Sequence, residues 1–317
     1  MTTYKETNGT NIEILSTDPA NPVQGQIWYN TTSSTLKGLG YIGTAAWSTG
    51  GNLNTARAAT GGAGTLTAGL AFGGGYPAKA NTESYNGSSW TELNDLNTVR
   101  AELAGTGTQT AALAFGGYPT LSLTETWNGT NWTEVNNLNT GRDNVGSATA
   151  GTNTATLAFG GLSLTANTEL WNGTNWTEVN NLNTATRGIA GAGTSTSALS
   201  SGGANPGITA NTETWNGTNW TEVNNLNTAR RNPGGAGINN TSAIAYGGYS
   251  TAYIAITEEW NGTNWTEVAD LSTARSAASS IGSSAAALAG GGYNGSYLAT
   301  TEEWTGVGPA VQTFSDA

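Results

Sequence analysis

The stretch Trp127–Thr140, WNGTNWTEVNNLNT, recurs without a change at 171–184 and 215–228, and a close variant, WNGTNWTEVADLST, follows at 260–273. Aligned on their second tryptophan, the units follow one another every 42 to 45 residues. An arginine after each unit gives the same count of six. A period of this length with glycine and tryptophan punctuation is typical of β-propeller blades. The two markers are Trp47, Trp90, Trp132, Trp176, Trp220, Trp265 and Arg57, Arg100, Arg142, Arg187, Arg230, Arg275.

Each unit contains four short runs of strand character, which in the third unit lie at 143–151, 153–161, 166–173 and 175–182. Small residues fill most inner positions, and they suit strands that crowd near a central axis. No window shows an amphipathic helix of useful length. The sequence therefore predicts an all-β fold, a six-bladed propeller of four-stranded blades.

The turn between the third and fourth runs carries an Asn-Gly pair, which favours a two-residue hairpin loop. If Asn128 and Gly129 form that loop, Glu125 lies opposite Trp132. The other register places Glu125 opposite Glu134, an unfavourable pair of like charges. We therefore expect the first register.

Aromatic residues of the third and fourth strands are expected to form the core between blades. The adjacent glutamates would then be partly buried and need a cation, and the arginine that opens the next first strand recurs with the same period. We predict a ring of Glu–Arg contacts. The third-strand tryptophans are Trp127, Trp171, Trp215, Trp260 and Trp304.

The two ends of the array predict how it closes. Trp47 looks like a fourth-strand residue with no blade before it, and no second tryptophan follows Trp304. The strand around Trp47 should therefore complete the last blade and remove exposed sheet edges. The expected domains are an N-terminal attachment arm at 1–43, a propeller at 44–308 and a C-terminal tail at 309–317.

A glycine pair, two aromatics and a following arginine make each unit similar to the kelch motif. In one unit these residues are Gly116, Gly117, Trp127, Trp132 and Arg142. The resemblance covers about residues 44–306 and implies a kelch-like propeller. The unit departs from the kelch pattern in its shorter aromatic spacing and in its use of tryptophan where tyrosine is commoner.

Residues 16–38, STDPANPVQGQIWYNTTSSTLKG, do not belong to the repeat. A strand-like QIWYN, a polar turn at 31–34 and a second strand entering Leu36 predict a β hairpin in an extended arm. The sequence of this segment resembles short N-terminal segments of tail-fibre and other virion proteins of tailed phages, especially marine ones. The resemblance implies attachment to other virion proteins, with Ile27, Trp28 and Tyr29 as attachment residues. A β arm packed on the flank of the propeller is the alternative interpretation.

Composition and charge restrict the partners and the location expected for the chain. The chain has no cysteine, and its 10 basic and 21 acidic residues give a net charge of −11. An acidic chain of this kind argues against nucleic acid and anionic membrane as partners. No hydrophobic run reaches membrane-spanning length, and the first residues lack the features of a signal peptide. We expect a protein made in the host cytoplasm and carried on a virion, extracellular after release.

The sequence contains no histidine, so the commonest general base and metal ligand is missing. We expect no enzymatic activity, no catalytic residue, no cofactor and no metal site. Most carboxylates repeat with the unit, which indicates a structural role. The acids that do not repeat, Glu102 and Asp143 among them, show no recognisable catalytic pair. A glycosidase, which needs only two suitably spaced carboxylates, is a less favoured alternative.

The segments between the second and third strands differ most among the units, and they should share one face of the disc with the segments between blades. Variable loops on a rigid scaffold suit recognition, although loss of constraint would also produce such divergence. We expect Tyr253 and Tyr297 to contact ligand, whereas Tyr118, Tyr249 and Tyr293, each next to a glycine pair, are expected to pack within blades. The loops are 75–80, 118–123, 162–166, 204–210, 249–256 and 293–300, and their ligand candidates are Tyr253, Tyr297, Tyr76, Tyr118, Tyr249 and Tyr293.

These observations together favour a non-enzymatic phage virion protein, a tail fibre or decoration, whose propeller recognises a host-surface glycan or protein or serves structurally. A bacterial cell-surface or extracellular adhesion propeller is the alternative. A carbohydrate-active enzyme is the third reading.

Overall fold

The computed structural model describes residues 12–19, 26–42, 44–162 and 164–314. The regular elements in these ranges are all β-strands, so the expected all-β class is confirmed. Within the same ranges, no helix is long and apolar enough to cross a membrane. The chain divides into two compact units: unit 1 comprises Met1–Ala45 and Gly306–Ala317, and unit 2 comprises Ala46–Thr305.

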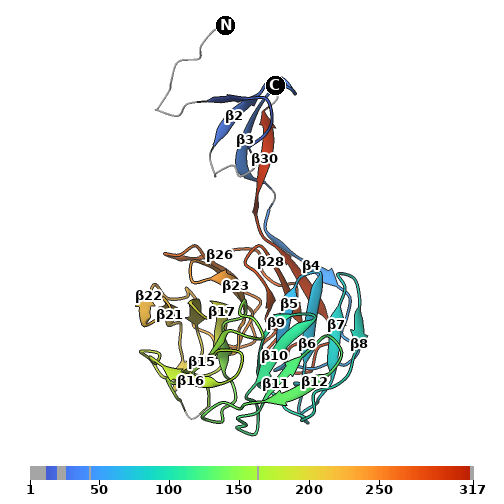
Figure 1. Cartoon of the computed structure of the whole chain (residues 1–317), viewed down its shortest axis with the longest axis vertical. Helices are drawn as coiled ribbons and strands as arrows, with labels where there is room; N and C mark the ends of the chain where they lie inside the picture. The colour runs from blue at the N-terminus through green and yellow to red at the C-terminus, as the bar shows by residue number, and fades with distance from the viewer. Residues whose placement is uncertain (1–11, 20–25, 43, 163, 315–317) are drawn as a thin grey trace. The chain divides into compact units, whose positions relative to one another are not determined.

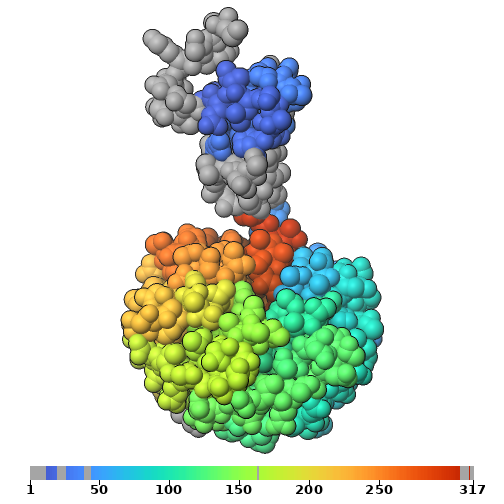
Figure 2. All heavy atoms as spheres, in the orientation of Figure 1, coloured from blue at the N-terminus to red at the C-terminus, as the bar shows by residue number. Residues whose placement is uncertain are grey.

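The described part of unit 2 contains six four-stranded antiparallel sheets (Figure 1). Figure 2 shows the repeats following one another around unit 2 in chain order. The sheets consist of β5 (Gly61–Thr65), β6 (Ala68–Phe72), β7 (Thr82–Tyr85), β8 (Trp90–Glu92); β9 (Ala104–Thr108), β10 (Ala111–Phe115), β11 (Thr124–Trp127), β12 (Trp132–Val135); β13 (Gly146–Ser147), β14 (Thr156–Phe159), β15 (Thr168–Trp171), β16 (Trp176–Val179); β17 (Ala190–Thr194), β18 (Ser197–Ser201), β21 (Thr212–Trp215), β22 (Trp220–Val223); β23 (Gly234–Asn239), β24 (Ser242–Tyr246), β25 (Thr257–Trp260), β26 (Trp265–Glu267); and β27 (Ile281–Gly282), β28 (Ala286–Gly290), β29 (Thr301–Thr305), β4 (Ala46–Gly50). A short pair, β19 (Ala204–Asn205) and β20 (Gly207–Ile208), lies in one of the loops.

The register of the third and fourth strands differs from the expected one. In the pair β11–β12, Trp127 lies opposite Trp132 and Glu125 lies opposite Glu134, so the predicted register is wrong. The two carboxylates do not share one environment, because Glu125 is buried beside Arg100 whereas Glu134 is exposed. Burial against a cation therefore removes the like-charge conflict on which the prediction rested.

The loop of this hairpin has four residues, from Asn128 to Asn131. The side-chain oxygen of Asn128 accepts hydrogen bonds from the backbone N–H groups of Thr130 and Asn131, both at 2.9 Å. Gly129 has a φ of 91°, a conformation that glycine adopts without steric cost. The Asn-Gly pair thus encodes the turn, but through side-chain capping of a longer loop.

Tryptophans of the fourth strands fasten each sheet to the one before it. The indole N–H of each donates to the hydroxyl of the threonine that begins the third strand of the preceding sheet, at 2.9 to 3.1 Å. Each buried tryptophan also removes roughly 150–250 Å² from water. The pairs are Trp90–Thr301, Trp132–Thr82, Trp176–Thr124, Trp220–Thr168, Trp265–Thr212 and Trp47–Thr257. These hydrogen bonds link each of the six sheets to the one before it, and the bond from Trp90 to Thr301 links the first sheet to the sixth.

A second series of contacts lies where the fourth strand of one sheet leads to the first strand of the next. One residue there in each repeat has a positive φ, and its N–H donates to the carbonyl of its counterpart in the preceding repeat at 2.8 to 3.0 Å. Because Ala59 donates to Ala277, the six bonds form a closed circle. We call these residues the central ring: Ala59, Glu102, Asn144, Gly188, Asn232 and Ala277.

The predicted Glu–Arg contacts occur in five of the six sheets of unit 2, between side chains that are almost fully buried. The guanidinium and the carboxylate belong to the same sheet, rather than to neighbouring ones as we expected. Each arginine opens the sheet and each glutamate lies in its third strand. The pairs are Arg57–Glu83 at 3.1 Å, Arg100–Glu125 at 3.0 Å, Arg142–Glu169 and Arg275–Glu302 at 2.7 Å, and Arg230–Glu258.

The sheet that begins with β17 departs from this pattern, and Arg187 does not have the structural role we expected. One extra residue in LNTATR places Thr186 at the buried position and Arg187 one residue later, where it is half-buried. Glu213 instead accepts hydrogen bonds from the backbone N–H and side-chain amide of Asn183 and from the N–H of Thr184, at 2.8 to 2.9 Å.

The last sheet combines the two ends of unit 2. Strand β4 pairs with β29, and Trp47 lies opposite Trp304. At the junction with the first sheet, the hydroxyl of Tyr85 donates to the carboxylate of Glu303 and accepts the N–H of Gly51 at 3.2 Å.

Unit 1 is a four-stranded sheet in the order β1 (Glu13–Leu15), β2 (Ile27–Asn30), β3 (Thr35–Ile42), β30 (Gly308–Phe314). The expected hairpin is confirmed as β2–β3 with its turn at 31–34. We expected 309–317 to be a separate tail, but β30 pairs along β3 and so satisfies the backbone groups of an edge that would otherwise be open.

One face of this sheet is organised around Asp18. Its carboxylate accepts hydrogen bonds from the indole of Trp28 at 3.0 Å, the amide of Asn30 at 2.6 Å and the ammonium of Lys37 at 2.7 Å. The hydrogen bond from Lys37, followed by those from Asn30 and Trp28, lowers the pKa of Asp18 to about 2.

Candidate functional site

Four of the six variable loops of unit 2 are held at both ends by a buried arginine. The guanidinium of Arg100 donates to the carbonyls of Gly116 at 3.0 Å and Leu123 at 2.7 Å, which bracket the loop 118–123. The N–H of Tyr118 donates to the carbonyl of Ala101, in the segment that precedes the first strand. The loops and the segments between sheets therefore share one face of unit 2, as predicted.

Four tyrosines form a continuous row on this face. The ring centroids lie 5.2 Å apart for Tyr249 and Tyr253, 5.6 Å for Tyr253 and Tyr293, and 5.3 Å for Tyr293 and Tyr297. The first and last pairs each close a tight loop through a β-bridge, so each loop presents one tyrosine at either end. We call these four residues the tyrosine row.

The tyrosine row lines a cavity of about 310 Å³, together with Tyr76, Glu102 and Arg231. This volume is within the usual range for small-molecule sites, roughly 300–1,000 Å³. The guanidinium of Arg231 lies 4.9 Å from the centre of the Tyr249 ring, an arrangement that attracts a cation to an aromatic face. The cavity thus combines several aromatic rings with one carboxyl group and one guanidinium.

Five of the six predicted ligand candidates line this cavity. Tyr253 and Tyr297 both line it, and so do Tyr249 and Tyr293, which we expected to pack within blades. Tyr118 is outside the lining: it is 46% exposed, and its ring contacts Tyr76 edge to face at 5.6 Å. The expectation that Tyr118 packs within its blade is therefore wrong.

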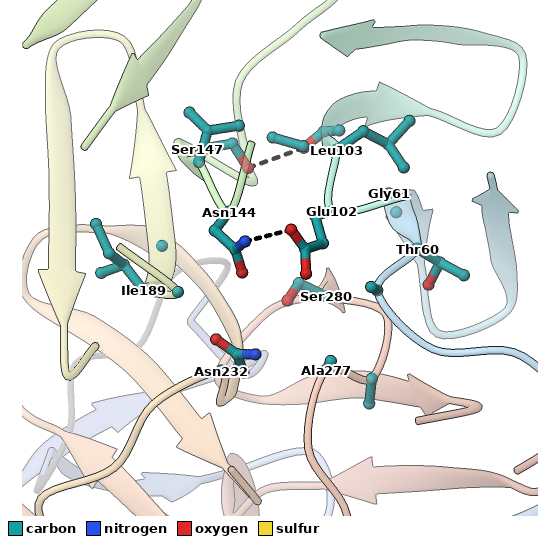
Figure 3. Close-up of a pocket in the computed structure, with 18 of the residues that line it drawn as sticks. Thr60, Gly61, Glu102, Leu103, Asn144, Ser147, Ile189, Asn232, Ala277 and Ser280 are labelled. Atoms are coloured by element: carbon teal, nitrogen blue, oxygen red, sulfur yellow. Dashed lines mark hydrogen bonds between the residues drawn. The ribbon is translucent and has the colours of Figure 1, made fainter. Parts of the chain in front are cut away.

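A smaller cavity of about 90 Å³ opens at the central ring (Figure 3). In this view Glu102 and Asn144 point towards each other, and the amide of Asn144 donates to the Glu102 carboxylate. The same amide lies 3.2 Å from a carboxylate oxygen of Asp143, whose other oxygen accepts from the hydroxyl of Thr120 at 3.2 Å.

Sequence reasoning missed this polar group, since Glu102 and Asp143 showed no recognisable pairing. The structure brings both to Asn144. The sequence does mark these positions, because the residues directly after each repeated arginine differ among otherwise similar units.

Burial raises the pKa of Glu102, while hydrogen bonds from Tyr76 and Asn144 act in the opposite direction. Burial and the neighbouring Glu102 carboxylate raise the pKa of the Tyr76 hydroxyl well above its ordinary value. Tyr76 is therefore a neutral hydroxyl at physiological pH. The cavity offers such a hydroxyl and a carboxyl as hydrogen-bonding groups beside the aromatic rings.

The repeated carboxylates have other environments. Those of the third strands are buried, five in ion pairs and Glu213 in hydrogen bonds with its backbone and amide partners. The fourth-strand glutamates are exposed. In the described ranges, no group of three or more acidic side chains could hold a metal ion. The fourth-strand set is Glu92, Glu134, Glu178, Glu222 and Glu267.

The predicted attachment residues divide between the two sides of the unit 1 sheet. Trp28 is fully buried, so its ring cannot serve a partner as we expected, whereas Tyr29 is 37% exposed and Ile27 is half-buried.

The repeated antiparallel sheets and their shared contacts define unit 2 as a β-propeller. A solved structure described as the structure of YjhT is similar to this chain with a TM-score of 0.66 and 14% sequence identity, over 82% of this chain and 99% of that one. At this identity the likeness shows the fold alone. No protein family matches the chain, and no curated protein matches it.

Proposed function

We propose that the chain is a non-enzymatic recognition protein of a phage virion appendage, with a six-bladed, closed, kelch-like propeller that binds a host-surface glycan in the cavity lined by the tyrosine row. Six sheets, the six backbone bonds of the central ring and the pairing of β4 with β29 support the closed arrangement. Unit 1 would join the propeller to other virion proteins.

The tyrosine row is the observation that carries the binding proposal. Aromatic rings can stack on the C–H faces of sugars, and tyrosine hydroxyls and carboxyl groups can bond to sugar hydroxyls. Four rings from two adjacent loops, with Tyr76 and Glu102 in the same cavity, provide both kinds of contact. Arg230 and Arg275 donate to backbone carbonyls at both ends of these two loops, which supports a site that is formed before a ligand arrives.

A binding screen of the full chain against bacterial surface glycans tests the proposal. Tyr253→Ala and Tyr297→Ala should each weaken binding of a positive glycan by about tenfold or more, because central aromatic contacts typically contribute above 1 kcal/mol. Ile238→Ala is the matched control, since Ile238 is 55% exposed and lies outside the cavity lining. No glycan binding by the wild-type chain, or equal binding by the tyrosine variants, would refute the proposed site.

The virion assignment has a separate test. The protein should be found by mass spectrometry in purified particles of the phage that encodes it. Its absence from such particles would refute the assignment and leave the glycan site to be judged by the binding screen.

A further inference from the structure

Six asparagine–glycine pairs lie in the described part of the chain, and all six asparagine side chains are exposed. Asparagine followed by glycine is the pair most prone to losing its side-chain amide in water, because glycine has no Cβ to hinder the approach of its nitrogen to that amide. Exposure does not separate the six, so their local contacts decide which of them reacts. The asparagines are Asn86, Asn128, Asn172, Asn216, Asn261 and Asn294.

Hydrogen bonds restrain the side chains of five of these asparagines. Each of the five lies in the hairpin loop between a third and a fourth strand, and its side-chain oxygen accepts two backbone N–H groups at 2.8 to 3.0 Å. Asn294 lies in a variable loop instead, and its oxygen accepts the N–H of Ser296 at 3.4 Å, beyond the usual range of about 2.7–3.2 Å. The side chain of Asn294 is therefore the least restrained of the six. We call the other five the capped asparagines: Asn86, Asn128, Asn172, Asn216 and Asn261.

The backbone beside Asn294 also has more room. A Cβ at Gly295 would have no neighbour within 4 Å, whereas a Cβ at the glycine after each capped asparagine would lie 3.2 to 3.5 Å from an atom of a threonine. The variable loop therefore leaves its glycine freer to move than the hairpin loops do.

Deamidation of such a pair takes two steps and consumes one water. The glycine nitrogen gives its proton to hydroxide and attacks Cγ of the asparagine. The new C–N bond closes a succinimide ring, and the bond from Cγ to the amide nitrogen breaks as ammonia leaves with a proton from water. Water then opens the ring at either carbonyl carbon, which gives aspartate or isoaspartate. The side chain of a capped asparagine must give up both hydrogen bonds before the attack, which slows the reaction by about tenfold or more.

We propose that Asn294 is a site of spontaneous deamidation, selected from the six pairs by the fold. The residue lies between Tyr293 and Tyr297, which a β-bridge joins, and its N–H donates to the carbonyl of Ser296 at 3.2 Å. Aspartate adds a negative charge to this loop, and isoaspartate also adds a methylene to its backbone. Both tyrosines belong to the tyrosine row. If the proposed function holds, the reaction therefore weakens glycan binding as the protein ages.

The neighbouring loop of the tyrosine row supplies a matched control. The segments YSTAY at 249–253 and YNGSY at 293–297 have the same length. A β-bridge joins Tyr249 and Tyr253, and the N–H of Ser250 donates to the carbonyl of Ala252 at 2.9 Å. A loop of this kind therefore forms without the asparagine–glycine pair. Asn294→Ser should keep the loop and remove the reactive amide.

Peptide mapping by mass spectrometry tests the proposal without any ligand, so its outcome is independent of the glycan screen. The tryptic peptide 276–317 contains Asn294 as its single asparagine. During incubation of the folded chain in mildly alkaline buffer, Asn294 should convert about tenfold or more faster than the capped asparagines. In concentrated urea the six rates should become similar. Equal rates in the folded chain would overturn the proposal. An equally large difference in urea would do so too, because the sequence rather than the fold would then set the rates.

The effect on the loop is measured with a glycan that the fresh chain binds. Incubated wild type should bind it more weakly in proportion to the conversion of Asn294, and Asn294→Ser incubated in the same way should keep its affinity. An affinity unchanged by complete conversion, or lost equally by the two proteins, would overturn the link between deamidation and the tyrosine row.

Discussion

Replacing Arg142 by methionine should destabilise unit 2 by about 3–5 kcal/mol, the usual cost of leaving one partner of a buried ion pair alone. The guanidinium donates to the carbonyl oxygens of Gly160 at 3.3 Å and Asn167 at 2.7 Å, and to the carboxylate of Glu169 at 2.7 Å. Methionine preserves much of the stem volume but supplies no donor. The variant therefore isolates the loss of these polar contacts from the loss of packing.

The contacts that Glu169 keeps in the variant narrow the expected loss of unfolding free energy. Its carboxylate still accepts from the backbone N–H and side-chain amide of Asn139, at 2.8 and 2.9 Å. Glu213 is buried with the same kind of hydrogen bonds and without an arginine, so these bonds can hold a buried glutamate in a sheet. We therefore expect a loss near the lower end, about 3 kcal/mol. Adding Glu169→Gln should recover about 1 kcal/mol or more, because it removes the unpaired buried charge.

Urea denaturation followed by tryptophan fluorescence measures these differences, and the melting temperature of Arg142→Met should fall by about 6–12 °C. Arg187→Met is the matched control: Arg187 is half-buried and outside the ion-pair series, so its loss should cost at most about 1 kcal/mol. If Arg142→Met and Arg187→Met lost the same stability, or if the first lost less than about 1 kcal/mol, the structural role assigned to the pairs would be refuted.

Three further predictions concern other parts of the chain. Burial, followed by the hydrogen bond to Glu303, raises the pKa of Tyr85 from 10.0 to about 12. Because the pKa is higher in the folded than in the unfolded protein, the contribution of Tyr85 to the stability of unit 2 is complete below about pH 10 and is lost as the pH rises through about 12. Tyr85→Phe should remove this step from the pH dependence of unfolding, and identical profiles for the two proteins would contradict it. Lys37, Asn30 and Trp28 lower the pKa of Asp18 from 3.8 to about 2, so the stabilisation of unit 1 by Asp18 is present above about pH 4 and is lost as the pH falls through about 2. Amide exchange in β2 should become faster over this pH range, and Asp18→Asn should abolish that pH dependence. Ala277→Gly should raise the urea midpoint of unit 2 by an amount equivalent to about 1 kcal/mol or less, since Ala277 has a φ of 53°; a lower midpoint would count against strain at the central ring.

Repetition made the architecture of unit 2 predictable, but the hairpin register was not. Counting tryptophans located the strands and placed the strand of Trp47 in the same sheet as the strand of Trp304. The two-residue loop rule failed because the side chain of Asn128 caps two backbone N–H groups and so stabilises a longer turn. The charge argument failed because Glu125 and Glu134 differ in burial, which strand periodicity alone does not reveal.

The candidate site was predictable only where it depends on local position. Tyr253 and Tyr297 lie deep in loops that differ among the repeats, and that position identified them. Glu102 and Asn144 are 42 residues apart, and they meet only because the central ring brings successive repeats together. Arg187 kept the arginine count intact while a one-residue insertion moved it out of the buried position.

The arrangement of the last sheet determines how unit 2 responds to mechanical load. Strands β4 and β29 pair with each other, and the segments that continue from them, β3 and β30, pair with each other too. Tension applied through unit 1 therefore reaches unit 2 through two neighbouring strands at once. The two strands share this load, and β29 is in turn hydrogen-bonded to β28 within the same sheet. A propeller tethered in this way resists unravelling one repeat at a time from a single loose end.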